Sequence, residues 1–506
     1  MPDAMNSHCR ITINRLVLLA LTAVVAPATA DGLTPHPDRP KLIFSEDTTY
    51  FTEPVTPDGT VDLFAALNRA GREGVDPQQN AVLRILPILP ESDRDDEDLG
   101  PMAAALGLNL AEAHAQGPRL TAIPWGPRDD DGPFVRASKG PWKLADLPEV
   151  ADWLEDNRAA LQALDAAVRL PQSYWPIVPS DPDSLILEAH TPGLRQSRVA
   201  GRALVLRIHA DWGEGEHGQA IHGVESLMHL GQHLSNQPSL IGSLVAISIR
   251  SLSASAVGPL LNDPQIPADA ARQLLAVIQN RSEMRPVASA MSTYERAIAL
   301  DVFQAAYAQP DRLGDGIGTV IKFAARSPMF DINLALKELN RSFDRVEQVA
   351  RLQTFAEVRP IAEKIEADLQ TQNPLLMGDA EKPLRQRFTL HTVRTAQNIL
   401  MPALAAAATS ELMHRSREEL LLVASALTVY RVDHGQYPKQ LAELVPDYLT
   451  KLPLDRYDGR PLTYKPGDQN QTYLLYSVGQ NGKDDQGAFD YREGDISIGN
   501  PLPEGW

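Results

Sequence analysis

The chain has 506 residues, of which 43% are hydrophobic and 22% charged, with a formal net charge of −18. These fractions are typical of folded globular protein and exclude general disorder, and the length predicts two to four domains. The acidic charge argues against nucleic acid and anionic lipid surfaces as partners, because both would be repelled.

Residues 1–30 have the pattern of a signal peptide. Arg10 and Arg15 precede an apolar stretch that is too short to span a membrane, and Ala28-Thr29-Ala30 forms a cleavage site before Asp31. We therefore expect an exported protein, periplasmic or extracellular, cleaved near Ala30. The only cysteine, Cys9, would leave with the signal, so disulfides and thiol chemistry are not expected in the mature chain.

A later apolar run, 238–261, is the nearest candidate for a membrane span. Arg250 interrupts it at its centre, where a bilayer would penalise the charge by about 2.5–3.5 kcal/mol. We expect no stable membrane span after removal of the signal.

Residues 31–149 form a region rich in proline and glycine. Short helices are expected at 62–70 and 77–86, with an acidic loop at 91–98. Three aromatic residues are spaced through the loop that follows, Trp125, Phe134 and Trp142. We expect them to pin this loop onto a neighbouring surface, and a carbohydrate platform is the alternative.

Residues 150–408 are expected to form a helical domain. Apolar residues recur at helical spacing from Val199 to Ala210, the sequence GEGEHG breaks the pattern, and a second helix follows to Leu234. This αα-hairpin is similar to tetratricopeptide units. A second apolar stripe is predicted to be core, and it consists of Ile332, Leu336, Leu339, Phe343, Val346 and Ala350. The pattern indicates an irregular antiparallel helical array, partly of such hairpins.

One helical segment carries a cluster of histidines. His222, Glu225, His229 and His233 fall on one face, opposite an apolar face that the helix can bury. Imidazoles at i and i+4 beside a carboxylate can bind Zn²⁺ or another divalent ion. The other interpretation is a polar face that lines a groove or meets solvent, since one helix seldom closes a tetrahedral site.

Residues 409–506 read as a small α+β domain. A helix from Ser410 ends at Gly435, Tyr437-Pro438 follows, and turn signals separate two expected antiparallel strands at 462–465 and 472–478. The expected fold class is therefore mostly α, with a small C-terminal α+β domain.

Two sequences in the tail are HGQYPKQLAELVPDYLTKLPLDRYDGRPLTY and YLLYSVGQNGKDD. They resemble the C-terminal domain of the major pseudopilin of type II secretion systems. DRYDG departs from the family's turn, and the prepilin-peptidase site is absent, so processing as a pilin is not expected. Three segments outside the tail also resemble a group of large secreted bacterial proteins, several of which have this tail and none of which has an established activity. These segments are TYFTEPVTPDGTVDLFAALNRAGREGVDPQQNAV, DWLEDNRAAL and INLALKELNRSFDR.

The pseudopilin resemblance implies one Ca²⁺ in the loop from Val478 to Ser497. The implied ligands are the carbonyl of Val478 and the side chains of Asn481, Asp484, Asp485 and Asp495. Clustered carboxylates and amides between glycines suit the oxygen preference of calcium.

The sequence has no metalloprotease, Walker or nucleophile-elbow motif, and Gly314-x-Gly316-x-Gly318 lacks the strand that a phosphate loop requires. We therefore expect a non-catalytic extracytoplasmic binding or scaffold protein with protein partners. Two alternatives remain open: a metal-dependent hydrolase or metal-binding protein using the His222–His233 face, and an accessory factor of a secretion pseudopilus.

Overall fold

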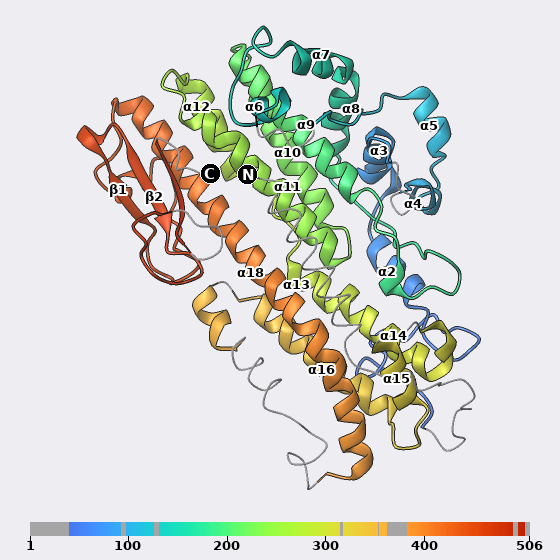
Figure 1. Cartoon of the computed structure of the whole chain (residues 1–506). Coiled ribbons are helices and arrows are strands. Elements are labelled where there is room, and N and C mark those ends of the chain that lie inside the picture. The colour runs from blue at the N-terminus through green and yellow to red at the C-terminus, as the bar shows by residue number, and fades with distance from the viewer. Residues whose placement is uncertain are drawn as a thin grey trace.

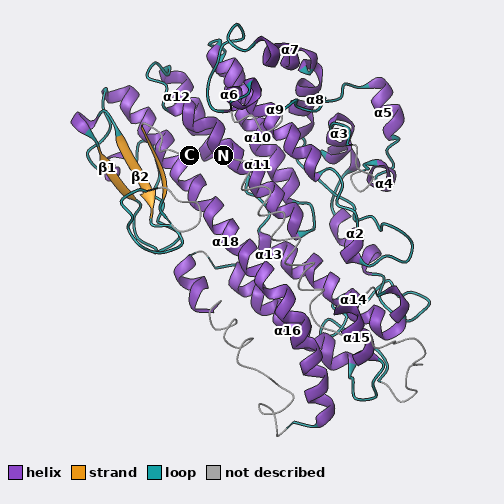
Figure 2. Cartoon of the chain, viewed as in Figure 1, coloured by secondary structure: helices purple, strands orange, loops and turns teal. Residues whose placement is uncertain are grey.

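Long helices dominate the computed structural model of the chain, and a small sheet lies at one side of them (Figure 2). The structure describes residues 40–92, 98–125, 131–313, 317–352, 354–361, 382–488 and 494–500. The expected signal peptide and the glycines at 314 and 316 lie outside these residues. The fold is mostly helical with a three-stranded antiparallel sheet.

The N-terminal region folds into short helices, as its composition indicates. They are α2 Leu63–Arg72, α3 Val82–Ile85, α4 Gly100–Ala105, α5 Leu110–Gln116, α6 Pro133–Ser138 and α7 Pro148–Asp156. Asp62 caps α2 by accepting the amide of Ala65. The second expected helix, 77–86, is broken, because 3₁₀ turns at Pro77–Gln79 and Leu86–Ile88 flank α3. Each of these turns contains a proline, which has no amide hydrogen to donate.

The middle of the chain forms a layer of longer helices. They are α8 Arg158–Val168, α9 Leu194–Gly213, α10 His217–Ser235, α11 Leu240–Leu261 and α12 Ala268–Gln279. The α9–α10 pair confirms the predicted hairpin, with the turn at the predicted glycine-rich break. Two close approaches need glycine: a Cβ at Gly223 would lie 2.7 Å from Ile208, and a Cβ at Gly231 would lie 2.5 Å from Arg250.

A second group of helices lies beyond this layer. It consists of α13 Val287–Ala290, a π-helical turn Met291–Glu295, α14 Arg296–Ala308, α15 Ile317–Ala325 and α16 Ile332–Ala350. The predicted stripe of α16 is confirmed as core at its centre, since Phe343 is 1% exposed. Val346 and Ala350 at its end are only partly buried.

Helix α18, Leu384–His434, runs along the whole array (Figure 1). It ends at Gly435, whose φ of 75° favours glycine and whose amide closes onto the carbonyl of Arg431. The domain boundary expected at 408/409 lies inside this continuous helix. The boundary expected at 149/150 lies inside α7 in the same way.

The sheet follows α18 and packs against its C-terminal half (Figure 1). Its strands are β1 Thr463–Pro466, β2 Tyr473–Ser477 and β3 Ile496–Asn500, in the order β1-β2-β3. The predicted pairing of the first two strands is confirmed, with Thr463 opposite Tyr476, and Leu475 lies opposite Ile498 of β3. Tyr473, Leu475 and Ile498 are buried and belong to the core that includes α18.

Two large hydrophobic cores share α18. Its N-terminal half contributes Val393, Ala396 and Leu404 to a core with α13–α16. Its C-terminal half contributes Leu420–Val429 to a core with α3, α8–α12 and the sheet. The short N-terminal helices also belong to these cores. Helix α11 contributes to both as well, with Leu240 and Ile247 in the first core and Val245 and Ile249 in the second.

Helix α11 is long and apolar enough to cross a membrane, and among the described residues it alone has that length and composition. It is mostly buried between α9, α10 and α18, and Arg250 at its centre is 2% exposed. These contacts are those of a core helix.

Candidate functional site

The loop after β2 is anchored at its start by a buried carboxylate, Asp455. Its Oδ1 accepts the hydroxyl of Ser477 at 2.8 Å, and its Oδ2 accepts the amide of Val478 at 2.9 Å. Burial raises the pKa of Asp455, and the hydrogen bonds from Tyr457, Ser477 and Val478 oppose this rise. Asp455 therefore fixes the end of β2, from which the candidate calcium loop begins.

The two ends of this loop lie against each other. A Cβ on Gly479 would lie only 2.1 Å from the carbonyl oxygen of Gly494, so only glycine allows this approach. Gly487 has a φ of +85°, and its amide donates to Asp495 Oδ2 at 2.7 Å. The described part of the loop is thus folded back onto the beginning of β3.

Asp495 is the one buried carboxylate among the implied ligands. It is fully buried, and its Oδ1 has no hydrogen-bond partner among the described residues. Burial raises the pKa of this carboxyl, against the hydrogen bonds from the amides of Gly487 and Asp485. A buried carboxylate oxygen without a partner is costly and suits a bound cation.

The other implied ligands are exposed or partly exposed and bond to their own loop. Asp484 Oδ1 accepts the amide of Gln486 and the hydroxyl of Tyr476, and these bonds lower its pKa. Asn481 donates to Asp485 Oδ2 at 2.8 Å. The part of the chain that the structure describes contains no group of three His, Cys, Asp or Glu side chains that could hold a metal ion. Asp495 alone among the implied side-chain ligands has a buried oxygen without a partner, and the exposed aspartates do not converge on it.

The histidine face of α10 packs against the C-terminal end of α8. His233 is 1% exposed, and its Nε2 lies 2.9 Å from the carbonyl oxygen of Val168. His229 Nδ1 lies 3.2 Å from the same oxygen. Both imidazoles are placed to donate to a carbonyl that α8 leaves without a helical partner, which is a capping role.

The other half of this face surrounds Arg169. A guanidinium nitrogen lies 2.6 Å from the His222 ring nitrogens and 3.3 Å from Glu225 Oε2. Burial lowers the pKa of His222, and the charge of Arg169 lowers it further. The interpretation of the whole row as a groove-lining or solvent-facing surface is wrong for His233, which is buried. The observed contacts join α8 to α10.

A buried ionic cluster between α11 and α18 was missed by sequence reasoning. Arg250 donates to Glu418 at 2.6 Å and to the carbonyl oxygens of Met228 and Ser282, and Arg281 lies 3.4 Å from Glu418. An arginine at the centre of an apolar helix was the available signal, but its partner is far away in sequence.

No protein-family model, curated protein or solved structure matched the chain.

Proposed function

We propose that the chain is an extracytoplasmic scaffold or binding protein whose C-terminal module resembles that of the major pseudopilin. The observation that supports it best is that α18 belongs to both the helical array and the module. The tail has the helix, Tyr-Pro turn and antiparallel strands that its resemblance implies. The exported location rests on the sequence of residues 1–30 and is tested by N-terminal sequencing, for which we expect Asp31.

The module is held rigidly because its helix is buried on several sides. Leu420 and Leu427 are fully buried in the core shared with α11, α12 and the sheet. Arg456, in the loop before β1, donates to Glu419 of α18 at 2.6 Å. A partner that docks on the sheet therefore meets a surface of fixed orientation relative to the array.

The proposed partner is a protein of the cell envelope or of a secretion apparatus. Strand β1 is an edge of the sheet, and edge strands offer unpaired backbone groups to a partner. Lys465 is exposed on this edge. The net charge of −18 disfavours nucleic acid as the alternative partner.

The test is a photo-cross-linking residue placed at Lys465 in the native host, with Ser255 as control. Ser255 is also exposed but belongs to α11 and not to the sheet. We expect a covalent adduct with an envelope or secretion component from position 465 only. Adducts of equal yield from both positions, or none at position 465, would contradict docking through the sheet.

We also propose that the loop from Val478 to Ser497 binds one Ca²⁺, with the unpartnered Oδ1 of Asp495 as its buried ligand. Calcium at one hundred times its dissociation constant should stabilise the mature chain by about 2.7 kcal/mol. The measurement is thermal melting with millimolar Ca²⁺ or with chelator, for the wild type, Asp495→Asn and Asp468→Asn. Asp468 is exposed in a different turn and serves as control. Identical melting in calcium and chelator would remove the proposal.

A further inference from the structure

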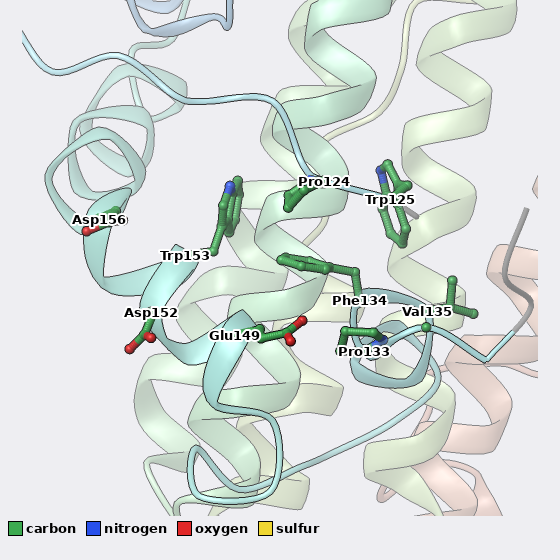
Figure 3. A pocket seen from close by; sticks show the side chains of 10 residues that line it. Pro124, Trp125, Pro133, Phe134, Val135, Glu149, Asp152, Trp153 and Asp156 are labelled. Atoms are coloured by element: carbon green, nitrogen blue, oxygen red, sulfur yellow. The ribbon is translucent and has the colours of Figure 1, made fainter. Parts of the chain in front are cut away.

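A cavity of about 380 Å³ opens between α6 and α7, and its walls combine aromatic rings with carboxylates (Figure 3). Phe134 lies at its centre, with Trp125 and Trp153 on either side at ring-centre distances of 6.3 and 6.1 Å. Phe134 and Trp153 are buried, which fixes their rings. This volume is within the range of small-molecule sites.

Helix α7 supplies the charge. Glu149, Asp152 and Asp156 line the cavity, and Figure 3 shows Glu149 extending toward Phe134. All three are exposed and, among the described residues, none forms an ion pair. Their spacing along α7 spreads three negative charges over about 10 Å.

The side chains of the lining accept hydrogen bonds but offer almost no donors. The indole N–H of Trp153 is used by the carbonyl oxygen of Ala122, which leaves Trp125 as the only lining side chain with a donor. A sugar needs both donors and acceptors around its hydroxyl groups. The chemistry therefore favours a ligand that donates hydrogen bonds and carries positive charge.

A metal ion does not fit this arrangement. The described residues hold no three acidic or imidazole side chains close enough to share one ion, so the three carboxylates act separately. A ligand whose positive charges are also separated can meet more than one of them. Methylene groups between those charges would cover the aromatic rings, and an ammonium group near a ring face gains cation–π attraction. The guanidinium of Arg202 lies 5.5 Å from the ring centre of Trp125, so this ring already has a cation and the ammonium groups of a ligand are left to the carboxylates of α7.

We infer that this cavity binds a linear aliphatic polyamine, with its ammonium groups on the α7 carboxylates and its methylene chain on the aromatic rings. The cavity involves neither the sheet nor the calcium loop, so this inference does not depend on the proposed scaffold role and is tested separately.

The experiment is isothermal titration of the full mature chain with spermidine at physiological salt. The test variant is Glu149→Gln with Asp152→Asn, and the control is Glu155→Gln. Glu155 is exposed on the same helix and pairs with Arg158, but it does not line the cavity. We expect saturable binding, weakened at least about tenfold in the double variant and little changed in the control.

A second comparison separates the polyamine site from diffuse attraction. Mg²⁺ has the charge but no apolar chain, so it should compete far less well than spermidine for the same site. Equal competition by Mg²⁺, or equal weakening by the control substitution, would show that only surface charge is involved and would overturn the inference. Binding of a neutral oligosaccharide without binding of spermidine would overturn it as well.

Discussion

Substitution of Glu418 by glutamine tests the buried ionic cluster that joins α11 to α18. The change keeps the shape of the side chain but removes the charge that faces Arg250 and Arg281, at 2.6 and 3.4 Å. Arg250 would then be a buried cation without a full counter-charge. Removing one partner of a buried ion pair typically costs about 3–5 kcal/mol.

The pKa of Glu418 gives a second measure of the same interaction. Burial alone would raise it, but His414, Arg250 and Arg281 together lower it to about 2. Burial lowers the pKa of His414 to about 4, so at pH 7 His414 is neutral and the arginines supply the attraction, whereas below about pH 4 protonated His414 adds to it. A carboxyl pKa lowered from about 4.3 to about 2 corresponds to about 3 kcal/mol.

The sign of the pH dependence follows from this lowered pKa. The ionised carboxylate stabilises the fold above its unfolded pKa, about 4.3, and the benefit is lost as pH falls toward 2. The cost of Glu418→Gln should therefore be about 3 kcal/mol at pH 7 and about 2 kcal/mol near pH 3.5. Urea unfolding followed by far-ultraviolet circular dichroism measures both values.

The neighbouring Glu419 is the matched control. It pairs with Arg456, yet burial dominates and raises its pKa, so its charge brings no comparable stability. Glu419→Gln should change the urea midpoint less than Glu418→Gln at pH 7, and its cost should not shrink in acid. Equal effects of the two substitutions at both pH values would refute the reasoning.

Three further predictions concern separate parts of the fold. Phe343→Ala should cost about 3–5 kcal/mol, because this ring is buried in the core of α16, and an unchanged melting temperature would contradict the core assignment. Gly231→Ala should destabilise the fold by about 1–3 kcal/mol, because its Cβ would press on Arg250. Gly218→Ala in the same helix meets open space and should stabilise the fold by up to about 1 kcal/mol. The melting temperatures of the two variants should therefore shift in opposite directions. Burial raises the pKa of Asp301 to about 6, so its contribution to stability is present below about pH 4 and is lost as pH rises through 6. Asp301→Asn should abolish a loss of about 2 kcal/mol between pH 4 and 7, and parallel stability curves for the two proteins would exclude this.

Local patterns predicted much of the helical architecture. The α9–α10 hairpin, the buried centre of α16 and the pairing of β1 with β2 each follow from periodicity and turn residues within a short window. Periodicity shows that a helix has a buried face but not which core that face joins. The continuation of α18 across residues 408 and 409 was therefore not predictable from the local pattern.

The candidate sites were less accessible to sequence reasoning for the same reason. His233 has the spacing of a metal ligand, but the carbonyl of Val168 that it contacts comes from another helix. Asp455 begins the DRYDG turn, and its role in holding Ser477 becomes visible only when the strands pair. Such roles depend on contacts between distant segments, which composition and spacing do not encode.

The position of α18 in the chain has a consequence for the order of folding. At 1.5 Å per residue its 51 residues extend about 77 Å, and both cores need its apolar residues to close. During synthesis the preceding helices emerge with their apolar faces uncovered until this late segment follows. Completion of either core thus waits for contacts of long sequence separation, which slow folding and prolong the life of incompletely packed intermediates. A chain interrupted before Leu384 would lack a helix that both cores contain and should be retained by chaperones or degraded.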